Sequence, residues 1–147
     1  MPPLIRRYIK TSFLFLLAGL LLGTYILVGE FVVGRYPPRL VITAHAHLLL
    51  VGFMLMVVMG VATWMFPRPG REDTRYRPEL AEAVYWIMTA GTLLRAGGEV
   101  WAGFSGAPLL RLAIALGGLG QLAGAALFVL NMWWRVRKPS AVPAPGR

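Results

Sequence analysis

Two histidines, His45 and His47, are the only ones in the chain. They stand near the start of an apolar run that continues to residue 66. Imidazole is the commonest protein ligand for metal ions and a frequent ligand of haem iron. An ionisable side chain inside a run of membrane-spanning length costs free energy, so it marks a functional site by default. We expect this pair to bind haem or another metal; the alternative is that both histidines hydrogen-bond within a helix bundle.

The spacing of the pair limits what one helix can do with it. Side chains two residues apart point about 200° apart around a regular helix, so both cannot ligate one iron from the same helix. We expect one histidine to face the bundle and the other a neighbouring chain. The face of His45 continues through Gly52, where a missing side chain leaves room for a flat porphyrin, to Thr63. This pattern favours His45 as the haem ligand.

Composition indicates a membrane protein. The chain has 147 residues, of which 57% are hydrophobic and 14% charged, with a mean hydropathy of +0.63. This profile is typical of membrane proteins and atypical of soluble domains. The absence of cysteine excludes disulfides, iron–sulfur clusters and thiolate-ligated haem. The basic residues that give the net charge of +9 are distributed as the expected membrane topology requires. We therefore do not expect nucleic acid as a partner.

Four apolar stretches are long enough to cross a bilayer, which requires about 20 helical residues. They cover residues 12–33, 40–66, 80–102 and 108–134. We therefore predict an all-α membrane protein, a bundle of four transmembrane helices formed by residues 1–138. Residues 139–147 are rich in proline and alanine and are predicted to be a disordered tail.

The basic residues predict the orientation, because cytoplasmic segments carry the excess of Lys and Arg. Eleven of the fifteen lie on one side in the four-span topology. Both termini should therefore be cytoplasmic, in a multi-pass protein of a bacterial-type inner (plasma) membrane with lipids as its surroundings. The eleven are Arg6, Arg7, Lys10, Arg68, Arg71, Arg75, Arg77, Arg135, Arg137, Lys138 and Arg147.

Other ionisable residues share the outer half of the membrane with the histidines. Glu30 ends the first span, Arg39 precedes the second, and Arg95 and Glu99 lie near the outer end of the third. A lone charge in an apolar phase is costly. We expect Arg39 and Arg95 to pair with haem propionates or with Glu30 and Glu99. The alternative for Arg95 is an ion pair with Glu99 along one helix.

Glycines recur at helical spacing on the first and fourth spans. Gly19 and Gly23 form a small-xxx-small face, and Gly117, Gly120 and Gly124 form a second stripe. Such faces let helices approach closely. We expect tight helix packing, and also a homo-oligomer, a trimer or dimer, in which a second chain completes the coordination of the metal.

The second span also carries a family pattern: Arg39, then His45-Ala-His47-Leu-Leu, Gly52-Phe-Met, Gly60, Trp64 and Phe66-Pro67. It resembles the catalytic subunit of haem–copper oxidases, especially the nitric oxide reductase branch, over its first four transmembrane helices. The resemblance implies that His45 is an axial ligand of b-type haem, with exchange of the two histidine roles left open. The family's other metal ligands come from later helices that this sequence lacks. We therefore expect no oxygen or nitric oxide reductase activity.

The resemblance implies a membrane haem protein that transfers electrons or binds a small gas such as nitric oxide, in respiration or denitrification. Respiratory-chain proteins would be its partners. The alternative is a non-haem accessory or assembly protein of a respiratory complex that binds copper or another metal ion through His45 and His47.

Overall fold

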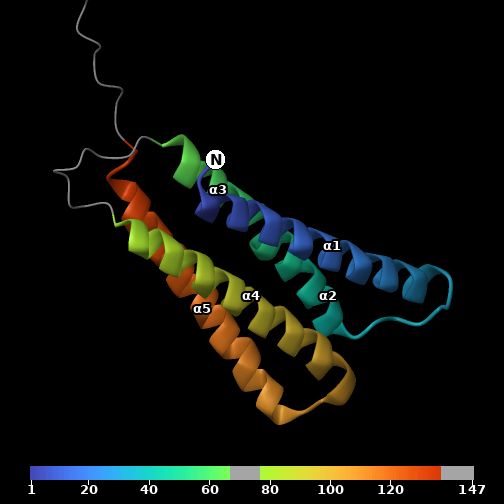
Figure 1. The fold of residues 1–147 in the computed structure, drawn as a ribbon. Helices are drawn as coiled ribbons and strands as arrows, with labels where there is room; N and C mark the ends of the chain where they lie inside the picture. The colour runs from blue at the N-terminus through green and yellow to red at the C-terminus, as the bar shows by residue number, and fades with distance from the viewer. Residues whose placement is uncertain (67–76, 137–147) are drawn as a thin grey trace, which may run out of the picture.

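The computed structural model describes residues 1–66 and 77–136, and all regular structure among them is helical (Figure 1). Helix α1 spans Pro3–Phe31. Helix α2 (Arg39–His47) continues without a break through the π-helical segment η1 (Leu48–Leu55) into α3 (Met56–Met65). Helix α4 spans Pro78–Ser105 and α5 spans Pro108–Trp133.

Proline and glycine set several of these helix ends. Proline occupies the first turn of α1, α4 and α5, where its fixed φ suits a helix and its missing N–H is not needed. Pro78 followed by Glu79 is a typical helix start, and α4 begins at Pro78. Gly106 follows α4 with a φ of 66°, the left-handed conformation in which helices commonly terminate.

Three helices are long and apolar enough to cross a membrane: Pro3–Phe31, Arg39–Met65 and Pro108–Trp133. The prediction of four such spans is therefore confirmed for three. The remaining predicted span, 80–102, lies in α4, which is as long as the others but carries Glu79, Glu82, Arg95 and Glu99. Helix α4 buries polar side chains, among them those of Thr92 and Glu99, inside the protein.

The helices form two antiparallel pairs. Helix α1 packs along α2, η1 and α3, and α4 packs along α5 (Figure 1). The short connection between α1 and α2 favours their antiparallel pairing. The pairs join mainly where α2 meets α4, so α1 and α5 lie at opposite edges. We call the end that carries the α1–α2 and α4–α5 connections the loop end.

The glycine stripes serve packing inside the chain. A Cβ on Gly19 would lie 2.5 Å from Leu49, and one on Gly117 would lie 2.6 Å from the backbone nitrogen of Arg95. In the same way, Met88 occupies the space beside Gly124. Tight helix packing is therefore confirmed. Because neighbouring helices of the same chain occupy these faces, they no longer support the predicted homo-oligomer.

Some predictions fall on other parts of the chain. The predicted disordered tail, residues 139–147, and most of the basic segment before α4 lie outside the described residues. The exposed large apolar side chains lie chiefly on α1 and α5.

Candidate functional site

His45 points from α2 towards α1. Its Nδ1 lies 2.8 Å from the carbonyl oxygen of Gly19. A Cβ added to Gly23 would lie 2.7 Å from Cε1 of His45, so the imidazole occupies the space that this glycine leaves. A carbonyl oxygen can only accept a hydrogen bond, so Nδ1 carries the proton and donates it. In the neutral ring, Nε2 then holds the lone pair.

His47 points the other way, towards α4. Its Nδ1 lies 2.9 Å from Oε2 of Glu99, a carboxyl group in a residue that is only 2% exposed. The ionised carboxylate accepts, so Nδ1 of His47 donates. The two histidines therefore lie on opposite sides of one helix, as their spacing predicted. Both histidines have partners on helices of the same chain, and the expectation that one faces a second chain stays a prediction.

Both imidazoles keep Nε2 available. Within residues 1–66 and 77–136, neither Nε2 atom makes a hydrogen bond. Metal-ligating histidines commonly donate one ring N–H to a carbonyl or carboxylate and bind the metal through the other nitrogen. His45 and His47 each have that arrangement.

A buried polar network extends from His47 across three helices. Arg95 donates from Nε to Oε1 of Glu99 at 3.3 Å and from a terminal nitrogen to Gln121 at 3.2 Å. Gln121 in turn donates to Thr92 at 3.2 Å. The network pairs the Glu99 and Arg95 charges, which would be costly alone in an apolar interior. The predicted Arg95–Glu99 ion pair is confirmed.

Gln121 stands beside the glycine stripe of Gly117, Gly120 and Gly124 in the sequence, whereas Thr92 was not predicted to belong to the site. A usable signal exists, because Thr92, Arg95 and Glu99 follow one another at intervals of three and four residues on a single helix face. That periodicity marks one polar stripe on α4, directed at α2 and α5.

The structure leaves two other predicted residues outside this cluster. Arg39 is exposed at the start of α2, and Glu30 is partly buried near the end of α1. Among the described residues, neither has an ion pair. Their roles beside a haem stay predictions.

The room expected beside Gly52 is occupied. A Cβ on Gly52 would lie 2.8 Å from the ring of Phe15, and one on Gly60 would lie 2.8 Å from Tyr8. These glycines admit aromatic side chains of α1. A porphyrin cannot lie against this face of η1 and α3 while α1 is packed there, so the small side chains have a different purpose from the one predicted.

The described residues hold no cluster of three or more His, Cys, Asp or Glu side chains that could enclose a metal ion. His47 and Glu99 make a pair of potential ligands. A closed metal site formed by this cluster would need further ligands from elsewhere.

The chain matches no family model and no solved structure.

Proposed function

We propose that the chain is an integral membrane protein that binds b-type haem through Nε2 of His45. The observation that carries the proposal is the Nδ1 contact to the Gly19 carbonyl at 2.8 Å. This contact fixes the tautomer and the ring orientation, and in the neutral ring it leaves the lone pair on Nε2 as the candidate ligand for iron. The likeness of the His45-to-Pro67 stretch to haem–copper oxidases, in their nitric oxide reductase branch, adds a second and independent line of support.

The residues around His45 fit haem in one respect and not in another. The imidazole chemistry fits an axial ligand. The face at Gly52 does not fit the macrocycle, because Phe15 fills it. The haem must therefore approach Nε2 of His45 from outside the α1–α2 contact. Arg39 and Arg95 remain the candidates for pairing with its propionates.

The surrounding residues keep the ligand in place. The α1 backbone holds His45 through Gly19, while the His47–Glu99–Arg95 network holds α2 against α4. When bound, haem supplies one-electron redox chemistry or an open axial position for a small gas. We propose electron transfer or nitric oxide binding in respiration or denitrification as the biological role, next to respiratory-chain proteins.

The further parts of the proposal follow from the positive-inside rule and the coordination chemistry. Both termini are cytoplasmic in a bacterial-type inner membrane, with α4 as the fourth membrane-crossing helix. A second copy of the chain, in a dimer or trimer, would supply any further protein ligand that the haem requires, because His45 is the one ligand proposed in this chain. The chain is a carrier or binding protein and not an oxygen or nitric oxide reductase.

A second candidate is a copper- or other metal-binding accessory protein. The observation in its favour is the contact between His47 and Glu99 at 2.9 Å, which brings an imidazole and a carboxylate together. Two chains could each contribute such a pair to one metal ion.

An absorption spectrum of the purified protein separates the two candidates. Haem binding predicts a Soret band and a pyridine haemochrome spectrum of b type, with iron equimolar to haem. A colourless protein that retains copper or zinc after dialysis supports the metal-binding alternative and refutes the haem proposal.

A further inference from the structure

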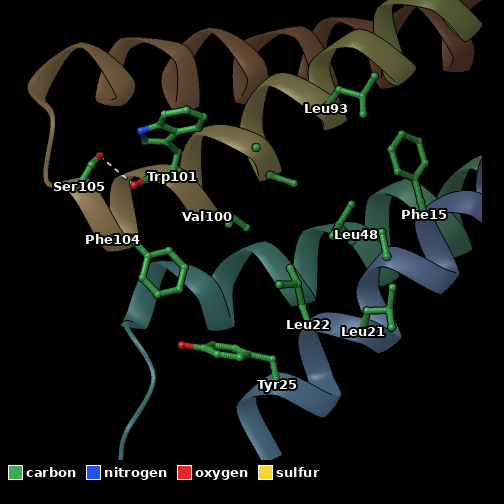
Figure 2. Close-up of a pocket in the computed structure, with 13 residues that line it drawn as sticks. Phe15, Leu21, Leu22, Tyr25, Leu48, Leu93, Val100, Trp101, Phe104 and Ser105 are labelled. Carbon is green, nitrogen blue, oxygen red and sulfur yellow. Dashed lines mark hydrogen bonds between the residues drawn. The ribbon is translucent and has the colours of Figure 1, made fainter. Parts of the chain in front are cut away.

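An apolar groove opens between α1 and α4 on a different face from the histidine contacts. Its volume is about 930 Å³. Leu48 forms its floor, and Figure 2 shows Leu22 and Phe15 of α1 facing Leu93 and Val100 of α4 across it. Helices α1 and α4 contact each other away from the loop end, where Arg7 pairs with Glu82 and Tyr8 packs on Tyr85, and the groove lies between them beyond that contact.

The groove has the length of one membrane leaflet. Its α1 wall runs from Phe15 to Tyr25, which is about 15 Å at 1.5 Å per residue. Half of a hydrocarbon core about 30 Å thick is also about 15 Å. Its loop end is marked by an edge-to-face contact of Tyr25 with Phe104, whose ring centroids are 6.2 Å apart. Such aromatic residues gather at the level of lipid headgroups.

A cation lies directly beyond this aromatic contact. Tyr25 also lines a smaller pocket of about 330 Å³, which includes Arg35 and Tyr36 of the α1–α2 connection. Within the described part of the chain, the Arg35 side chain has no ion pair. Arginine binds phosphate oxygens strongly because its planar guanidinium offers paired donors. The apolar groove, about as long as one membrane leaflet, thus ends near Arg35, which has no ion pair among the described residues.

We propose that this groove binds one anionic phospholipid, with an acyl chain between α1 and α4 and its phosphate at Arg35. The size of the groove favours a lipid over a transmembrane helix. A helix segment as long as the groove, about 15 Å, and 10–12 Å wide occupies roughly 1,200–1,700 Å³, which exceeds the groove volume. The groove volume lies within the range of about 300–1,000 Å³ that is usual for small-molecule sites.

The lining also disfavours a ligand that needs hydrogen bonds along its length. The polar side-chain groups of the α4 wall, Ser105 Oγ and the indole N–H of Trp101, both lie towards the loop end, and Ser105 Oγ already donates to the carbonyl of Trp101 at 2.9 Å (Figure 2). The remaining lining is almost entirely apolar. The recognition chemistry is therefore confined to the Arg35 end, as it is in an amphiphile with a charged head.

Gly97 allows a direct test, because a Cβ added there meets no atom within 4 Å although the residue lines the groove. Gly97→Phe should fill the groove without disturbing the helices. Leu119→Phe, on the exposed face of α5, is the matched control for added aromatic bulk. Arg35→Gln removes the cation, and Arg111→Gln is its control, since Arg111 is exposed near the same end and lines neither pocket.

The protein would be reconstituted with phosphatidylglycerol and phosphatidylcholine, and native mass spectrometry would count the lipids retained per chain. We expect one retained phosphatidylglycerol, its loss in Gly97→Phe, and a roughly fivefold fall in the preference for phosphatidylglycerol in Arg35→Gln. Both controls should behave like the unmodified chain. Unchanged retention in Gly97→Phe, or an unchanged preference in Arg35→Gln, overturns the proposal. A changed oligomeric state in Gly97→Phe would identify a helix-docking site instead, and a lost Soret band would assign the groove to haem.

Discussion

Replacing Glu99 with alanine tests whether the buried network holds α2 to α4. The carboxyl group accepts from His47 at 2.9 Å and from Arg95 at 3.3 Å, and the residue is 2% exposed. Its removal leaves the Arg95 charge partly buried, with Gln121 as its remaining hydrogen-bond partner. Breaking a buried ion pair by deleting one member typically costs about 3–5 kcal/mol. We therefore expect Glu99→Ala to lower the free energy of unfolding by about 3 kcal/mol.

Glu82 provides a matched control on the same helix. It pairs with Arg7 at 2.7 Å, but the two side chains are 50% and 42% exposed. Exposed ion pairs contribute under about 1 kcal/mol. The assay is unfolding in mixed micelles at increasing denaturing detergent, followed by helical circular dichroism. If Glu99→Ala and Glu82→Ala have equal effects, the network does not hold the helices together. Glu99→Gln, which keeps a hydrogen-bond acceptor, should be intermediate.

Three further predictions concern the packing, the ion pair and the topology. Gly117→Leu should destabilise the α4–α5 pair by about 1–3 kcal/mol or more, since its Cβ would meet backbone atoms of α4, and unchanged thermal unfolding would contradict this. Arg95→Leu should lower haem occupancy or the midpoint of thermal unfolding, because it leaves Glu99 without its cation; if both are unchanged, Arg95 lacks the assigned role. Reporter proteins fused to either terminus should be active in the cytoplasm, and a periplasmic C-terminal reporter would refute the topology.

Periodicity and helix-end signals were enough to predict most of the fold. Pro78 marked the start of a helix, and the two-residue spacing of the histidines predicted their opposite directions. These features are local, so the sequence determines them directly. The start of α1 was predicted too late, at residue 12, because Arg6, Arg7 and Lys10 lower the hydropathy without breaking the helix.

The partners of the site residues depended on which helices pack together. Gly52 indicated a space, but no local signal identified Phe15 as the side chain that fills it. Nothing in the sequence identified Glu99 as the partner of His47, because the pairing of α2 with α4 is a tertiary feature. The π-helical segment that begins directly after His47 was also unforeseen, since its residues are ordinary helix-compatible apolar side chains. Such segments are rare and often accompany functional sites.

The most direct test of the central claim is the absorption spectrum of the purified protein and of two variants, His45→Ala and His47→Ala. We expect a b-type Soret band in the unmodified protein, its loss in His45→Ala, and its retention with a shifted maximum or altered gas affinity in His47→Ala. Loss only in His47→Ala would exchange the roles of the two histidines. Retention in both variants, or no Soret band in the unmodified protein, would contradict haem ligation by this helix.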